Sequence, residues 1–168
     1  MRIPRARWTK DQPPRLAFVL PTPVAEICQA LPDRLRELLI HPERSPQVID
    51  RLFPRTHETE VDEREHRRLL GESLLERRRD QVEAYAELIA AAEPLRLQRG
   101  LRLLLPRASI DLFMRVTNDY RLLLATEMGI EDNEWQLDAS LFQDRQREFV
   151  ELVWLSGIQE ILLEALTQ

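Results

Sequence analysis

The chain has 168 residues, of which 43% are hydrophobic and only four are glycine, and this composition disfavours a disordered or low-complexity protein. Its formal net charge of −5 offers no general attraction to phosphate backbones, so direct binding of nucleic acid would require a local basic patch. No apolar run approaches the roughly 20 residues that span a bilayer, and no signal-peptide core follows the basic N-terminus. We therefore expect one mainly α-helical domain, residues 1–168, that is located in the cytoplasm and does not enter a membrane.

Two short strands are predicted near the start of the chain, at residues 2–9 and 15–20. Leu16, Phe18 and Leu20 alternate with other residues, and turn-forming residues at 11–14 separate the two segments. This pattern indicates a small β-hairpin.

A first helix is predicted from Thr22, which is followed by proline in the favoured first helical position. Pro32 removes one backbone donor within this helix, which predicts a kink or a split. Cys28 lies one turn earlier and is expected to be buried. A short helical turn follows at 46–54, and residues 55–61 are expected to form an exposed connection.

A long helix is predicted from about Asp62 to Ala92, and Gly71 and Ser73 could divide it in two. Arg78 falls on its apolar stripe, where the guanidinium must either reach out to solvent, which we favour, or meet a carboxylate. The other arginines of this helix alternate with glutamates and aspartates. Such mixing favours ion pairs on a solvated helix over a surface that binds nucleic acid.

A third strand is predicted at residues 101–105. The segments 15–21 and 102–106 share one order, in which Arg-Leu starts an apolar strand and Leu-Pro ends it before a helix. We therefore expect this strand to pair with the N-terminal ones. The predicted fold class is mainly α, a helical bundle of four to six helices with a small N-terminal β-hairpin or three-stranded sheet.

The last two helices, predicted at about 106–128 and 141–166, carry two polar signatures within apolar sequence. The first polar signature is Asn118-Asp119-Tyr120-Arg121-Leu122, and the second is Trp154-Leu155-Ser156-Gly157-Ile158-Gln159-Glu160. Helical spacing places Asn118 and Arg121 on a partly enclosed column and Gln159 among aliphatic side chains. Polar side chains on buried faces need hydrogen-bond partners, so these residues mark specified contacts.

The candidate site consists of six residues, Asn118, Asp119, Arg121, Trp154, Gln159 and Glu160. Arg121 could pair with Glu160 or Asp119, and Asn118 could bind Gln159, where the two helices pack. We favour a buried network that fixes the register of the helices, because no nucleophile or metal ligand accompanies it. The alternative is an enzyme or small-molecule-binding site, which requires a solvent-connected pocket with convergent polar groups.

The sequence contains no motif for catalysis, metal binding or nucleotide binding. Asp62 and His66 have the i, i+4 spacing of two ligands on one helix face, and His57 lies nearby, but nothing completes a recognisable metal set. The serines lack a Gly-x-Ser-x-Gly turn, Cys28 has no neighbouring histidine, and no glycine-rich loop is present. We expect a non-enzymatic protein without a metal or other cofactor.

The two signatures, together with Leu124, Gly129-Ile130 and the Leu-Phe-Pro segment at 52–54, resemble a bacterial domain-of-unknown-function family, the one numbered twenty-seventeen. With the strand-to-helix segments at 15–31 and 102–121, the likeness covers most of the chain. Members of this family are typically encoded near the adaptor of the Clp protease in actinobacteria. The resemblance therefore implies a regulatory or protein-binding role.

One family member, an actinomycete oxidative-stress regulator that works with a sigma factor, is similar in the C-terminal signatures. It carries a close pair of N-terminal cysteines as its switch, whereas residues 1–15 here contain no cysteine and Cys28 is alone. An internal disulfide switch is therefore excluded. The expected partner is a protein related to transcription or to the Clp protease, bound through an exposed helix face or the hairpin edge, and the apolar final helix could also form a homodimer.

Overall fold

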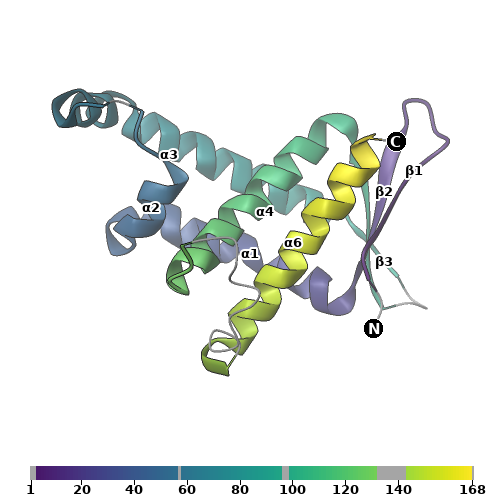
Figure 1. Cartoon of the computed structure of the whole chain (residues 1–168). Helices are drawn as coiled ribbons and strands as arrows, with labels where there is room; N and C mark the ends of the chain where they lie inside the picture. The colour runs from purple at the N-terminus through teal and green to yellow at the C-terminus, as the bar shows by residue number, and fades with distance from the viewer. Residues whose placement is uncertain (1–2, 57, 96–98, 132–142, 168) are drawn as a thin grey trace.

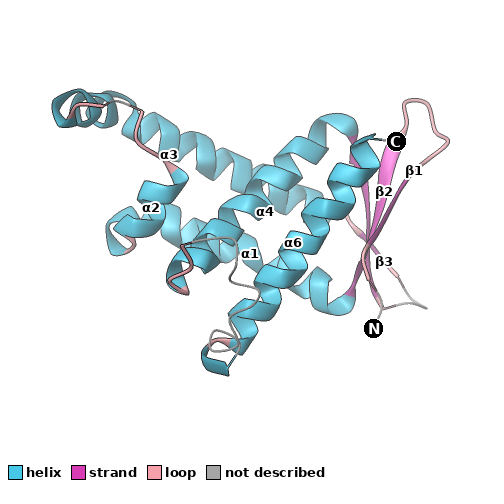
Figure 2. Cartoon of the chain, in the orientation of Figure 1, coloured by secondary structure: helices cyan, strands magenta, loops and turns pink. Residues whose placement is uncertain are grey.

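The computed structural model describes residues 3–56, 58–95, 99–131 and 143–167, and it is mainly helical with one small sheet (Figure 2). The sheet lies at one end of the helical bundle, and the N-terminal part of α3 extends from the opposite end (Figure 1). The predicted fold class is confirmed. The described elements are β1 (Arg5–Trp8), β2 (Arg15–Pro21), α1 (Thr22–Ile40), the 3-10 turn η1 (Pro42–Arg44), α2 (Pro46–Leu52), α3 (Glu60–Ala90), β3 (Glu93–Pro94), β4 (Gly100–Pro106), α4 (Arg107–Glu127) and α6 (Gln146–Thr167).

The sheet has the strand order β1-β2-β4-β3, and each neighbouring pair is antiparallel. The third strand predicted at 101–105 is β4, which pairs with β2 along its whole length. Leu16, Phe18 and Leu20 of β2 are fully buried, so the predicted alternation is confirmed. β3 was not predicted, because a strand of two residues is too short to show any alternation.

Three aromatic rings join the sheet to the helices in the centre of the core. Phe113 of α4 packs edge-on against Phe18 of β2, with ring centroids 5.8 Å apart and an interplanar angle of 85°. The ring centroid of Tyr85 on α3 lies 5.2 Å from that of Phe113, in a tilted arrangement with an interplanar angle of 38°. Each such pair adds about 0.5–1.5 kcal/mol beyond the burial of its area. The contacts fix α3 and α4 relative to the sheet.

α1 runs through Pro32 without a break, so the split that we considered does not occur. Proline at this position has no N–H to donate to the carbonyl oxygen of Cys28, four residues earlier. The hydroxyl of Tyr85 on α3 donates to that oxygen at 3.3 Å, and both Cys28 and Tyr85 are fully buried, as predicted for the cysteine. The backbone oxygen of Cys28, which receives no hydrogen bond from Pro32, therefore accepts one from a side chain of another helix.

α3 is a continuous helix of 31 residues and is not divided at residues 71–73. Thr59 caps its N-terminus, since the Thr59 hydroxyl oxygen accepts from the backbone N–H of Asp62 at 3.1 Å. The predicted ion pairs on its surface are present, for example between Arg68 and Glu65 at 2.7 Å. These pairs agree with a solvated, mixed-charge helix.

α4 and α6 pack against each other and carry the two polar signatures. α4 ends at Glu127, and Gly129 follows with a φ of +71°, in agreement with the predicted stop. The predicted start of the last helix at Leu141 lies outside the described residues, and α6 is described from Gln146. None of the described helices combines the length and the hydropathy that crossing a bilayer requires.

Candidate functional site

The first polar signature directs consecutive side chains of α4 to different neighbours. Successive residues of an α-helix are rotated by about 100°, so Asp119, Tyr120 and Arg121 cannot share one face. Asp119 and Tyr120 are buried and Arg121 is half-buried, whereas Asn118 is exposed. The expectation that Asn118 is partly enclosed is therefore wrong, because Asn118 lies on the same exposed face of α4 as Asp111 and Arg115.

Asp119 faces α3 and binds Arg78. The Nη1 of Arg78 donates to Oδ2 of Asp119 at 2.5 Å, and the two side chains are 24% and 8% exposed, respectively. Burial raises the pKa of the Asp119 carboxyl above its ordinary value, and the positive charge of Arg78 opposes this rise. The favoured expectation that Arg78 reaches into solvent is thus wrong, because a buried carboxylate on the neighbouring helix provides a partner.

Arg78 also contacts the Leu-Phe-Pro segment at the end of α2. Its Nη2 donates to the backbone oxygen of Leu52 at 3.4 Å, and its guanidinium lies over the Phe53 ring, 5.5 Å from the centroid. Arg78 therefore joins α2, α3 and α4, and it brings two of the sequence features of the family resemblance together. Their contact could not be read from spacing, because Arg78 and Asp119 are 41 residues apart.

Tyr120 faces the N-terminal half of α6. Its hydroxyl donates to Oε2 of Glu151 at 2.7 Å, and Nε of Arg147 donates to Oε1 of the same carboxylate at 3.0 Å. Burial raises the pKa of Tyr120, and the hydrogen bond to Glu151 acts in the same direction. Nothing in the sequence distinguishes Glu151 from other glutamates; the available signal was the polar tip of a tyrosine on a buried face, which needs a partner.

Arg121 faces the C-terminal half of α6 and joins the two signatures. Its Nη1 donates to Oε1 of Gln159 and to Oδ1 of Asn118, the latter at 3.4 Å. Nε2 of Gln159 in turn donates to the backbone oxygen of Met114 on α4 at 3.4 Å. In the C-terminal half of α6, the polar contact between these two helices thus runs through the Gln159 amide.

The charge on Arg121 is only partly compensated. Burial lowers the pKa of its guanidinium, and the charge of Glu160 opposes this effect. Among the described residues, Arg121 forms no ion pair with Glu160, which is exposed, or with Asp119, which pairs with Arg78. The buried Nε of Arg121 also has no hydrogen-bond partner there. The expected ion pairs of Arg121 are therefore wrong, and an amide replaces the carboxylate.

Trp154, the aromatic residue of the second signature, lines a groove between α1 and α6. The α1–α6 groove has a volume of about 740 Å³. It is lined by Pro23, Glu26, Ile27 and Ala30 of α1 and by Gln146, Arg147, Val150, Glu151 and Trp154 of α6. Because Glu151 is held by Tyr120, the first signature supports one wall of the groove. The other five candidate residues do not line it.

Within the part of the chain that the structure describes, no group of three or more His, Cys, Asp or Glu side chains is placed to hold a metal ion. His66 lies on α3, and His57 lies outside the described residues.

Comparison with protein families gives one match. The family described as "Domain of unknown function (DUF2017)" matches residues 5–166, which include both polar signatures and the Leu-Phe-Pro segment. The chain belongs to this family. No curated protein and no solved structure matches it. The narrower likeness to an oxidative-stress regulator has no support from these comparisons.

Proposed function

We propose that this DUF2017 chain is a non-enzymatic regulatory protein that acts in the cytoplasm by binding a protein partner. The observation that carries the proposal is the α1–α6 groove, an apolar surface that Trp154 of the second signature helps to form. The alternative, an enzyme or small-molecule site at the polar cluster, has weaker support. Asp119, Tyr120 and Arg121 contact three separate neighbours and do not converge on one cavity.

The chemistry of the groove suits the apolar face of a helix from another protein. Ile27 and Ala30 on one side and Val150 and Trp154 on the other give it apolar walls, while the charged residues lie among them. Grooves between two helices bind amphipathic helices through apolar side chains spaced three to four residues apart. Large aromatic residues are also frequent at the centres of protein interfaces. The resemblance to the family points to a partner related to transcription or to the Clp protease.

The test compares two valines on the same helix. Val150 lines the groove and Val153 does not, yet both belong to α6 and they are 39% and 43% exposed. We expect Val150→Asp to abolish, and Val153→Asp to retain, capture of RNA polymerase, a sigma factor or a Clp component from the native cytoplasm, with direct binding then measured on the purified partner. Equal capture by both variants, at equal melting temperature, contradicts the groove as the binding site.

Two other outcomes contradict the proposal more broadly. Recovery of nucleic acid alone would exclude a protein partner. A dimer in light scattering that Val150→Asp converts to a monomer would show that the groove is occupied by a second copy of the chain.

A further inference from the structure

The sheet presents one face to the helices and the other to solvent, and the solvent face is basic. Alternate residues of a strand point to opposite faces, and residues directly opposite each other in neighbouring strands share a face. One row across β1, β2 and β4 therefore consists of Arg5, Val19 and Arg102, and the next consists of Arg7, Ala17 and Leu104. With Arg15, which is also on this side of β2, these residues define the outer face.

The outer face has more positive charge than its own acidic residues compensate. Arg15 pairs with Asp11 at 2.8 Å, and Arg102 lies 3.6 Å from Glu93. Arg5 and Arg7 are both exposed, and neither forms an ion pair with any residue that the structure describes. A chain with a net charge of −5 thus has a local basic surface on its sheet. An oppositely charged partner is attracted to such a surface.

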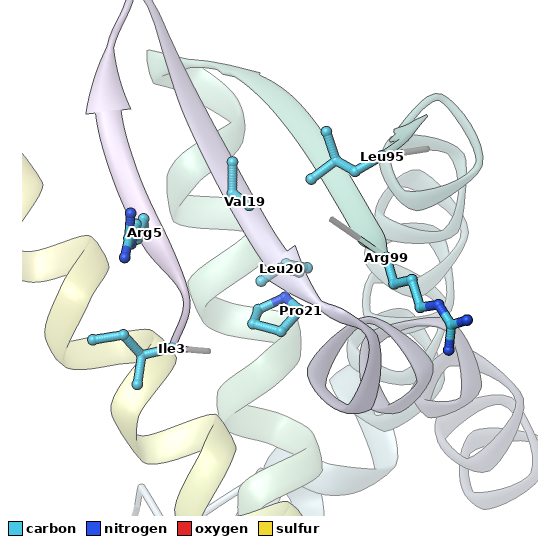
Figure 3. A pocket seen from close by; sticks show the side chains of 7 residues that line it. All are labelled: Ile3, Arg5, Val19, Leu20, Pro21, Leu95 and Arg99. Atoms are coloured by element: carbon cyan, nitrogen blue, oxygen red, sulfur yellow. The ribbon is translucent and has the colours of Figure 1, made fainter. Parts of the chain in front are cut away.

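A small hollow at one end of the outer face adds an apolar site between two arginines (Figure 3). Arg5 of β1 lies on one side and Arg99, just before β4, on the other, with Val19 and Pro21 between them (Figure 3). Ile3, Leu20 and Leu95 complete the lining, and the volume is about 240 Å³. This volume is below the range of about 300–1,000 Å³ that is typical of small-molecule sites, and it suits a side chain.

The backbone places Arg99 at the hollow in an unfavourable conformation. Its φ is +47°, in the left-handed region that glycine and asparagine occupy more easily than arginine. Gly100 follows with a φ of +151°, and a Cβ there would lie 2.2 Å from the backbone oxygen of Leu20. The close approach of β4 to β2 therefore requires glycine at position 100, and an arginine side chain is held beside the hollow at position 99 although another residue would be less strained.

We infer that the outer face binds an acidic segment of a partner protein. An apolar side chain of the segment enters the hollow, and flanking carboxylates pair with Arg5 and Arg99, whose guanidinium groups suit carboxylates. Proteins that bind single-stranded nucleic acid on a sheet stack the bases on aromatic side chains, and the described residues of the outer face include none. Its apolar centre of Ala17, Val19 and Leu104 instead matches the core of a protein interface.

This surface is distinct from the α1–α6 groove, so the two proposals fail separately. The hollow is lined by the sheet and the segments next to it, and none of its lining residues lines the groove. A variant such as Val150→Asp is expected to leave binding at the outer face unchanged.

The test starts from an unbiased set of ligands. Random peptides of about 12 residues, displayed on phage, are selected against the full chain. We expect the recovered sequences to combine glutamate or aspartate with one large apolar residue. In fluorescence anisotropy, the best labelled peptide should bind the double variant Arg5→Glu/Arg99→Glu at least about tenfold more weakly than the wild type, and high salt should weaken wild-type binding.

The matched control is Arg64→Glu, because Arg64 is an exposed arginine on α3, away from the sheet. It should bind the peptide as the wild type does, and Arg5→Gln/Arg99→Gln repeats the test if the charge reversal lowers the melting temperature. The inference is overturned if the selected peptides are not acidic, or if the charge reversal leaves binding intact. It is also overturned if a single-stranded oligonucleotide binds more tightly than the peptide and loses its binding in the same double variant.

Discussion

Replacing Arg78 with alanine should strongly destabilise the fold, because it leaves the Asp119 carboxylate buried without its cation. Removing one partner of a buried ion pair costs roughly 3–5 kcal/mol. Since the Arg78 side chain is 24% exposed and part of its attraction is screened by water, we expect the lower end, about 3 kcal/mol. For a chain of this size this corresponds to a fall of about 6–12 °C in melting temperature.

Replacing the partner, Asp119, with alanine should lower the free energy of unfolding by less. In Asp119→Ala the guanidinium of Arg78 keeps its contacts with Leu52 and Phe53, and because the side chain is 24% exposed, water can solvate the donor that loses its partner. We expect a loss of roughly 1.5–2 kcal/mol, the lower part of the range of about 1.5–3 kcal/mol for a hydrogen bond that involves a charged group. The asymmetry arises because only the carboxylate is deeply enclosed.

The cost of Arg78→Ala should also depend on pH. Without the arginine, burial raises the pKa of Asp119 further above its ordinary value of 3.8. A carboxyl whose pKa is raised in the folded state contributes stability below its unfolded pKa and loses it as the pH rises through the folded pKa. The difference between Arg78→Ala and the wild type should therefore shrink as the pH falls from about 7 to about 4, near the ordinary carboxyl pKa of 3.8.

Urea unfolding followed by circular dichroism at both pH values measures these quantities, with Arg68→Ala as the control. Arg68 is also on α3 and pairs with a carboxylate, but both partners are exposed, so its removal should leave the unfolding midpoint unchanged. Equal losses for Arg68→Ala and Arg78→Ala, or a loss at Arg78 that does not change with pH, would refute the reasoning.

Three further predictions concern other contacts. Arg121→Ala should lower the unfolding free energy by roughly 1–2 kcal/mol, because Gln159 loses its donor across the α4–α6 contact. An unchanged melting temperature would contradict this prediction. Burial raises the pKa of the Cys28 thiol from 9.0 to about 12. The contribution of this neutral thiol to the free energy of unfolding should therefore be lost as the pH rises from 9.0 to about 12. In the folded chain, Cys28 should react with thiol reagents only as fast as the chain opens. Immediate labelling of Cys28 at neutral pH would contradict this. Gly100→Ala should destabilise the sheet strongly because its Cβ has no room, whereas Gly71→Ala, in open space on a helix, should stabilise the chain by about 0.5–1 kcal/mol, and equal effects in thermal melts would contradict the assigned backbone geometry.

Local patterns in the sequence predicted the elements of the fold because the signals lie within a few residues of each other. The alternation at Leu16, Phe18 and Leu20 predicted β2, and the repeated Arg-Leu and Leu-Pro order predicted that β4 belongs to the same sheet. Pro32 shows where local rules end. The hydroxyl that donates to the backbone oxygen of Cys28 belongs to Tyr85, 57 residues later in the chain. Rules for helices relate residues only a few positions apart, so they could not predict this contact.

The candidate site was less predictable, because a helical wheel gives the face of a residue and not the identity of its neighbour. The wheel correctly placed Arg121 and Gln159 between apolar helices, but it did not show that Asp119 faces α3. The arginines of the sheet were missed for another reason. Arg5 and Arg7 alternate visibly on one strand, but the net charge of the whole chain concealed a basic surface.

The three consecutive contacts of the first polar signature restrict which changes of length α4 can accept. An insertion of one residue between Arg107 and Asn118 rotates everything after it by about 100° relative to the sheet. Asp119, Tyr120 and Arg121 would then lose α3 and both halves of α6 together. Substitutions in this segment can be compensated one contact at a time, but insertions and deletions cannot, so its length is fixed even where its composition is free to change.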